Sequence, residues 1–296
     1  MAIPGIGSLT SGTAYHYTNA AGLHGILKEK CLWASSALQM NDSSEIAFAI
    51  EVVREAVRTR GDSPSARVRD LMSDDWGVQL RADVYIASAS AEQDLLTQWV
   101  HYGGALGYNV GIDIASNLQP LGRPPQGPYG IVDNVRLPIN GWYRVLYKRE
   151  EQLSAVHRVL DVLDANGLVQ GVDAAGDVHL NSIFATLVPQ FKHPAFADER
   201  EIRYIAGRQS FLQERHRPGA YGLVPYVELR AAPSGAYGAT DQKTATLPLV
   251  SAWAGPTPQG ERESARDALR RAMDAYGYQG IAIDASTIPY RYSRRG

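Results

Sequence analysis

The sequence predicts an α+β fold in which helices flank a mixed, largely antiparallel sheet. Segments with strand and helix patterns follow one another without the strict alternation that builds a doubly wound parallel sheet. Of the 296 residues, 45% are hydrophobic and 20% are charged, as in ordinary globular domains. No break in composition marks a domain boundary, and no long repeat is present. We therefore expect a single domain over residues 1–296, with its core at about residues 14–291.

The chain opens with a short strand followed by a helix. Residues 14–18 carry the aromatic and polar alternation of a strand. Leu23, Ile26 and Leu27 then recur at helical spacing. We expect these three side chains to form the buried face of the first helix.

The second helix has the clearest start signal in the sequence. Asp42 is a good N-cap, and Glu45 three residues later completes a capping box. Asn41 belongs to the same polar block but has no part in this cap. An apolar stripe at helical spacing follows, formed by Ile46, Ile50, Val53 and Val57.

The middle of the chain predicts two strands and a loop. Residues 83–90 and residues 107–114 both have strand patterns, and we expect them to pair with each other. Proline and glycine crowd residues 117–130, which predicts a long surface loop.

The second half of the chain predicts five more strands and three more helices. The expected strands are 142–147, 201–206, 224–229, 246–252 and 280–284. Helical spacing of apolar residues predicts helices at 153–163, at about 181–190 and at about 261–276. The last helix lies between two strands, so this end of the chain resembles a βαβ unit.

Charge and cysteine content exclude several classes of protein. Lys and Arg number 29 against 31 Asp and Glu, which leaves no overall basic character for nucleic acid or an acidic membrane. The single Cys31 excludes an intramolecular disulfide and a multi-cysteine zinc site. The chain begins without a signal-peptide pattern and has no long apolar run, so we expect a cytoplasmic protein without membrane contact.

Searches for common catalytic motifs find nothing. The sequence contains no GxxxxGK(S/T), GxGxxG, HExxH or GxSxG motif. Its seven histidines have no metal-ligand spacing, so we expect no bound metal. This absence of ligand clusters disfavours a nuclease or another metal-dependent hydrolase.

Two aromatic and polar stretches are candidates for ligand binding. A strand at Tyr15-His16-Tyr17-Thr18 places His16 and Thr18 on one face, where they can hydrogen-bond a sugar-like ligand. The alternative is a histidine satisfied by the backbone. A helical turn in LLTQWVHYGG would present Gln98, Trp99 and Tyr102 to a cleft, where the aromatic pair suits stacking on a flat heterocycle. The alternative is that Trp99 belongs to the core.

A third candidate lies between Lys192 and Arg203. The strand period of two places Glu199, Glu201 and Arg203 on one face. Burial would raise the pKa of such a carboxylate unless Arg203 or Lys192 offsets it, and this balance is typical of a working site. The alternative is an ion-pair ladder on the surface.

The order and spacing of these blocks resemble a known family. YHYT, NDSSE, LLTQWVHYG, FKHPAFADEREIRYI and AIDASTIPYR, found between Tyr15 and Arg291, resemble the bacterial family catalogued as domain of unknown function 2971. The opening histidine-tyrosine strand and the late acidic strand are similar to those of the ADP-ribosyltransferase superfamily. This resemblance implies an ADP-ribosyltransferase-like split sheet and NAD as a substrate.

The resemblance also implies roles for individual residues. Glu201 matches the catalytic glutamate of the superfamily, Glu199 completes an ExE-like pair, and His16 matches the histidine that contacts NAD. The other residues expected to contact NAD are Tyr17, Thr18, Ser88, Trp99, Tyr102 and Arg291, and further polar candidates are Asn41, Gln98, Lys192 and Arg203.

These features together predict an NAD-consuming enzyme. It is expected to transfer ADP-ribose to a protein or nucleic-acid acceptor or to hydrolyse NAD, as a toxin or phage-defence effector with an immunity protein as partner. The alternative is a non-catalytic module that binds a nucleotide or nucleic acid with the same cleft.

Overall fold

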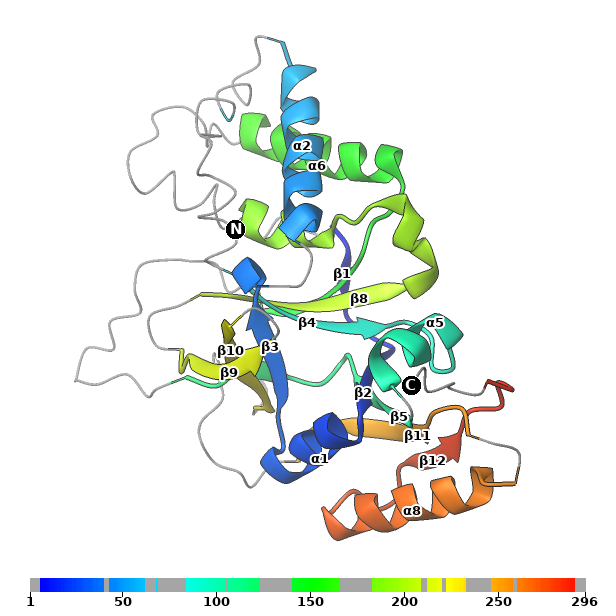
Figure 1. Ribbon diagram of the computed structural model, residues 1–296. Coiled ribbons are helices and arrows are strands. Elements are labelled where there is room, and N and C mark those ends of the chain that lie inside the picture. Colours follow the sequence, from blue (N-terminus) through cyan, green and yellow to red (C-terminus); the bar gives the residue numbers. More distant parts are fainter. Residues whose placement is uncertain are drawn as a thin grey trace, which may run out of the picture.

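The fold is α+β, with helices on either side of one large curled sheet (Figure 1). The computed structural model describes residues 6–39, 43–61, 68, 84–104, 106–122, 140–165, 183–208, 212–219, 222–232, 246–257 and 260–290. The sheet is mixed but mostly antiparallel, and β11 with β12 forms its parallel pair in this part of the chain. The predicted α+β fold with a mixed, largely antiparallel sheet and flanking helices is therefore confirmed.

The main path of the sheet runs in the order β1-β7-β8-β4-β2-β5-β11-β12. Its strands are β1 (Ser8–Leu9), β7 (Gly141–Arg144), β8 (Glu201–Gly207), β4 (Val84–Ser90), β2 (Thr13–Asn19), β5 (Gly107–Asp113), β11 (Leu249–Ala254) and β12 (Ala282–Ala285). A branch leaves this path through β3, which pairs with both β4 and β10. The strands of the branch are β3 (Leu32–Ser36), β10 (Gly222–Ala231), β6 (Leu118–Pro120) and β9 (Arg215–Gly219).

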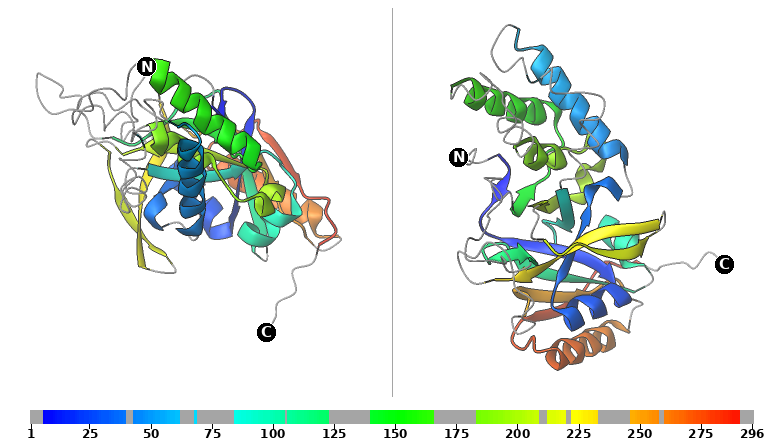
Figure 2. Two further views of the ribbon diagram at one scale, coloured as in Figure 1. Left: turned by 90° about the horizontal axis from the view of Figure 1, so that it is seen from above. Right: turned by 90° about the vertical axis from the view of Figure 1, so that its left-hand side faces the viewer.

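The four longer helices form two groups that pack against the sheet from opposite sides. Figures 1 and 2 show α2 (Ser43–Arg58) and α6 (Arg149–Ala165) at one end and α1 (Ala20–Glu29) and α8 (Arg262–Ala275) at the other. Shorter helical turns are η1 (Ala37–Gln39), α5 (Leu96–Gln98), η3 (Trp99–Gly103), η4 (Val188–Gln190) and η5 (Pro194–Glu199). Within the described ranges, no helix has both the length and the apolar character needed to cross a membrane.

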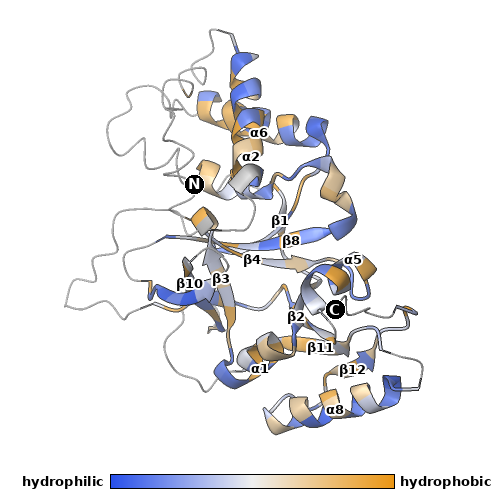
Figure 3. Ribbon diagram, viewed as in Figure 1, coloured by the Kyte–Doolittle hydropathy of each residue, from blue (hydrophilic) through white to orange (hydrophobic). Residues whose placement is uncertain are grey.

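Two apolar clusters form the core, one on each side of the central strands. The predicted stripe of α2 is buried, and Val53 packs in a cluster with Val159 of α6 and Ile205 of β8. The second cluster contains Leu27 of α1 and Met273 of α8, which pack with residues of strands that include β5 and β11. Figure 3 shows hydrophobic and hydrophilic bands alternating along α8, as expected for a helix with one buried face.

The predicted pairing of residues 83–90 with residues 107–114 is wrong. Both segments are strands, but β2 lies between them and is antiparallel to each. The connection through α5 and η3 carries the chain from one side of β2 to the other. Strand pairing depends on such long connections, which local side-chain patterns do not encode.

The predicted surface loop at residues 117–130 also contains a strand. Residues 118–120 form β6 against β10, with Pro120 at the strand's last position. Proline is tolerated at a strand end because it lacks only a ladder donor. The rest of that loop from residue 123 and the proposed cap Asp42 lie outside the described residues.

Candidate functional site

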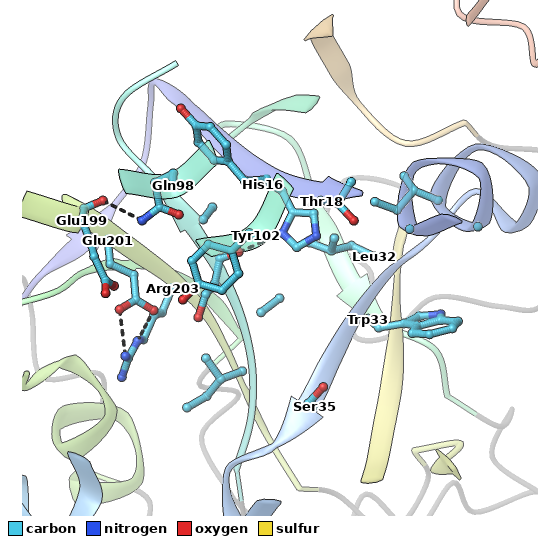
Figure 4. A pocket seen from close by; sticks show the side chains of 18 of the residues that line it. His16, Thr18, Leu32, Trp33, Ser35, Gln98, Tyr102, Glu199, Glu201 and Arg203 are labelled. Atoms are coloured by element: carbon cyan, nitrogen blue, oxygen red, sulfur yellow. Dashed lines mark hydrogen bonds and ion pairs between the residues drawn. The ribbon is translucent and has the colours of Figure 1, made fainter. Parts of the chain in front are cut away.

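A pocket of about 570 Å³ lies where β2 and β4 diverge (Figure 4). In the described part of the chain β2 pairs with β4 only at Tyr15 and Ser90, whereas it pairs with β5 along its whole length. His16 and Thr18 of β2 and Ser88 of β4 line the space between the two strands. This volume is typical of a site for a small organic ligand.

Five charged side chains, here called the charge cluster, line one end of the pocket. Lys192 Nζ lies 3.0 Å from Glu45, 2.7 Å from Glu199 and 2.9 Å from Glu201. Arg203 Nε lies 2.8 Å from Glu201, and its Nη2 lies 2.7 Å from Glu45. The charge cluster thus holds three carboxylates against two cations.

The strand pattern explains only part of this geometry. Glu201 and Arg203 lie two residues apart on β8 and share a face, as predicted. Glu199 is the last residue of the turn η5, not part of the strand, so its predicted place in the alternation is wrong. Arg200 has a left-handed backbone with φ of 48° that turns the chain between the two glutamates. Glu199 still joins the charge cluster because Lys192 binds its carboxylate.

The backbone around Lys192 is held in place by buried hydrogen bonds from side chains of α6 and β8. Gln152 of α6 donates to the carbonyl of Leu146 at 2.7 Å and to that of Lys192 at 2.9 Å. Arg203 Nη1 donates to the carbonyl of Pro189 at 2.8 Å, which fixes the preceding turn. The cations therefore have little freedom to move away from the carboxylates.

The electrostatics of the charge cluster keep both Glu201 and its partners ionised. Burial alone would raise the pKa of Glu201, but Arg203, Lys192 and a hydrogen bond from Ser88 together lower it to about 2. Burial would lower the pKa of Lys192, yet the adjacent Glu201 and Glu199 raise it above its ordinary value. Since Glu201 is only 6% exposed and Arg203 only 1%, the alternative of a surface ion-pair ladder is wrong.

The two glutamates differ in how many partners they already have. The Glu201 carboxylate accepts from Arg203 Nε at 2.8 Å, and from Arg203 Nη2 and Lys192 Nζ at 2.9 Å each. A carboxylate has about four lone-pair sites, so these three bonds already occupy most of the accepting capacity of Glu201. Glu199 binds Lys192 through Oε2, and its Oε1 has no hydrogen-bond partner among the described residues. Glu199 therefore presents a carboxylate oxygen that a ligand can reach.

His16 lines the pocket from β2. Its Nδ1 lies 2.9 Å from the Ser88 carbonyl oxygen, which can only accept, so Nδ1 carries the proton. Burial lowers the pKa of His16 against the opposing effect of this hydrogen bond. The neutral ring then offers Nε2 as an acceptor. His16 is thus satisfied in part by backbone and still able to bind a hydroxyl group.

The turn after β4 divides its predicted residues between the pocket and the core. Gln98 and Tyr102 line the pocket, and Tyr102 is 48% exposed. Trp99 is not one of the lining residues and is only 2% exposed. Its ring packs edge-on against Tyr17 with centroids 4.6 Å apart, and its Nε1 donates to Asp94 at 2.7 Å. Of the two readings weighed for Trp99, its placement fits the core one.

Of the four remaining predicted residues, two line the pocket and two lie outside the described part of the chain. Tyr17 and Thr18 line the pocket, and the Tyr17 hydroxyl donates to the Glu92 carbonyl at 2.7 Å. Asn41 and Arg291 lie outside the described residues.

Sequence reasoning missed a second set of lining residues. Glu45 was assigned to a capping box, but both its oxygens bind cations of the charge cluster. The lining residues that the sequence did not point to as ligand-binding are Ala21, Gly22, Gly25, Ile26, Cys31, Leu32, Trp33, Ser35, Ile86, Ala87, Ala89 and Arg217. The tryptophan of KCLWASS and the basic RHR stretch at 215–217 were the available signals.

Comparison with protein families, with curated proteins and with solved structures finds no match. Within the described part of the chain, no group of three or more His, Cys, Asp or Glu side chains is arranged to hold a metal ion. The geometry of the pocket is therefore the basis of the proposals that follow.

Proposed function

We propose that the protein is an ADP-ribosyltransferase-like enzyme that binds NAD as its substrate in the pocket between β2 and β4. The observation that carries this proposal is the excess of carboxylates over cations in the buried charge cluster that lines the pocket. The divergence of β2 from β4 supports the corresponding split-sheet fold.

The chemistry of NAD suits this excess of negative charge. The bond between nicotinamide nitrogen and ribose C1′ breaks with its electron pair leaving on nicotinamide, which departs neutral. Positive charge moves onto the ribose in an oxocarbenium-like transition state. An oxygen or nitrogen of the acceptor, or water, bonds to C1′ and releases its proton. Fixed carboxylates stabilise this positive charge most strongly in the transition state, where it is most developed.

Each lining residue has a role consistent with its contacts. Glu201 supplies fixed negative charge, and Glu199 Oε1 accepts a hydrogen bond from a ribose or acceptor hydroxyl. His16 Nε2 accepts from a second hydroxyl group, and Tyr102 stacks on the nicotinamide ring. As a toxin or phage-defence effector, such an enzyme would modify a protein or a nucleic acid and would be paired with an immunity protein.

One observation favours a second candidate function. Because Glu201 already accepts three hydrogen bonds from Arg203 and Lys192, the charge cluster also resembles a structural ion network. A non-catalytic nucleotide- or nucleic-acid-binding module would use the same pocket without turnover.

Nicotinamide release distinguishes the two functions. The purified protein is incubated with NAD, and nicotinamide is followed by chromatography for the wild type, Glu201→Gln and Glu199→Gln. We expect Glu201→Gln to slow release by about 100-fold or more, as loss of a fixed transition-state charge does, while NAD binding persists. Glu51→Gln, an exposed glutamate on α2, is the matched control.

Two outcomes would contradict the proposal. Release that is equally fast in Glu201→Gln and Glu51→Gln removes Glu201 from the mechanism. NAD binding without release by the wild type, with and without candidate acceptors, identifies a binding module.

A further inference from the structure

The end of the pocket away from the charge cluster is formed by one face of the β3–β10–β9 branch. Figure 4 shows Trp33 and Ser35 of β3 on this side, away from Glu201 and Arg203. Trp33 and Ser35 are two residues apart on one strand, so their side chains share a face. Arg217 of β9 reaches the same face, where its Nη2 donates to Ser35 Oγ at 3.1 Å.

Arg217 differs from the other cations near the pocket. Lys192 and Arg203 are bound by carboxylates, and Arg215 on the same strand as Arg217 is paired with Glu228 at 2.9 Å. Among the described residues, Arg217 has no carboxylate partner, and its buried Nε makes no hydrogen bond. A buried donor without an acceptor is unfavourable, because it has lost its hydrogen bond to water and gained none in the protein. The guanidinium group of Arg217 therefore has no anionic partner within the described residues, and an anion that enters the pocket could supply one.

Trp33 provides a flat apolar surface beside this cation. Its ring packs against Tyr226 with centroids 4.6 Å apart and planes tilted by 34°, which fixes its orientation. The side chain nevertheless remains 42% exposed and lines the pocket. An oriented, partly exposed indole is suited to stacking on a planar ring of a ligand.

We propose that Trp33, Ser35 and Arg217 form a subsite for the adenine and phosphate half of a nucleotide. Arg217 binds phosphate oxygens through its planar fork of N–H groups, and Trp33 stacks on the base. A nucleotide combines both features, a phosphate anion and a planar heterocycle, in one molecule. The inference rests on the proposed function only in identifying NAD as that nucleotide, with its nicotinamide ribose at Glu201.

Calorimetric titration with ADP tests this subsite directly. ADP carries the base and phosphates but lacks the nicotinamide half, so its binding does not depend on turnover. We expect Arg217→Ala and Trp33→Leu each to weaken ADP binding about tenfold or more. Arg215→Ala is the matched control, because it removes the same charge from the same strand at a residue already paired with Glu228. We expect it to change ADP affinity less than twofold.

Adenosine separates the two contacts. It lacks phosphate, so its affinity should be insensitive to Arg217→Ala and still fall with Trp33→Leu. Arg217→Lys keeps the charge but loses the fork, and we expect intermediate ADP affinity. Thermal unfolding of each variant establishes that the fold is retained.

Three results would overturn the inference. They are an absence of ADP binding to the wild type, equal losses in Arg217→Ala and Arg215→Ala, and Arg217-dependent binding of a short single-stranded RNA by a protein that does not bind ADP. The fate of the proposed function is separate. Arg217-dependent ADP binding without nicotinamide release would support the subsite and contradict the proposed enzyme activity. Nicotinamide release without Arg217-dependent ADP binding would support the enzyme activity and contradict the subsite.

Discussion

Arg203 of β8 and Glu45 of α2 form a 2.7 Å ion pair although 158 residues separate them in the sequence. Lys192 binds the other oxygen of Glu45 at 3.0 Å. Since α2 packs against α6 at one end of the molecule, these two contacts join that end to the wall of the pocket. The charge cluster is therefore part of the structural framework as well as of the candidate site.

Replacing Lys192 with Met should strongly destabilise the protein. The variant leaves buried Glu199 and Glu201 and partly buried Glu45 with Arg203 as the remaining cation of the charge cluster. Breaking a buried ion pair in this way costs about 3–5 kcal/mol. We expect a loss of this size in the free energy of unfolding, measured with urea. Arg54→Met is the control, because Arg54 pairs with Glu51 on the exposed face of α2 and should cost less than about 1 kcal/mol. Similar losses in both variants would show that the charge cluster contributes little to stability.

The lowered pKa of Glu201 predicts sensitivity to acid. Because folding lowers this pKa from 4.5 to about 2, the ionised carboxylate stabilises the fold above pH 4.5, and this contribution disappears as the pH falls toward 2. The shift corresponds to about 3 kcal/mol. Urea unfolding at several pH values between 2 and 6 measures it. Glu201→Gln should show a shallower pH dependence over the same range, and an unchanged slope would exclude Glu201 as the source.

Gly25 gives a test of pocket shape. It lies within α1, lines the pocket, and an added Cβ would meet nothing within 4 Å. Gly25→Ala should raise the free energy of unfolding by about 0.5–1 kcal/mol, because alanine favours helix. The new methyl group occupies pocket volume, so we expect weaker NAD binding in the same variant.

Gly22→Ala is the control for this substitution. Its Cβ would clash with Thr18 Oγ1, and we expect this clash to cancel the increase in the free energy of unfolding that alanine gives in a helix. Equal stabilisation of both variants would mean that α1 and β2 do not approach as closely as described.

Trp99 and Tyr102 should respond in opposite ways. An added Cβ on Gly107 or Gly255 would approach the Trp99 ring within 3.2 Å or 2.9 Å, so this ring is tightly packed. Trp99→Phe should cost about 1–3 kcal/mol of stability, since it removes ring volume and the donor to Asp94, with NAD affinity unchanged. Tyr102→Ala should weaken NAD binding with little loss of stability. Calorimetry and thermal unfolding on both variants check this, and weaker NAD binding in Trp99→Phe would contradict the core assignment.

The elements with strong local periodicity could be predicted from the sequence, while their arrangement could not. The apolar stripe of α2 predicted that helix because burial of one face follows the helical period. The alternation of side-chain types predicted β8, in which residues 201–206 are buried on both faces of the strand. The insertion of β2 between β4 and β5 depends on a long connection with no local signature. Secondary structure was therefore predicted better than strand order.

Some residues of the candidate site could likewise be predicted from the sequence, and others could not. Glu201, Arg203 and Lys192 were predicted to offset one another, and they do. Glu45 satisfied the spacing of a capping box, and sequence alone could not reveal that the fold turns it toward two cations. Arg217 lies in a polar stretch that resembles solvated surface, and only pairing with β10 brings it to the pocket.

The pairing of β2 with β4 at a single position, Tyr15 with Ser90, has a consequence for backbone solvation. β2 lies in the middle of the strand order, yet its backbone pairs with β4 only at Tyr15, so elsewhere in the strand the amides that point away from β5 have no ladder partner in β4. These amides should exchange with solvent deuterium as rapidly as those of an edge strand, whereas β4, paired with β8 from end to end, should exchange slowly. A bound ligand would slow exchange along β2 first, so deuterium uptake by this strand reports occupancy without any turnover.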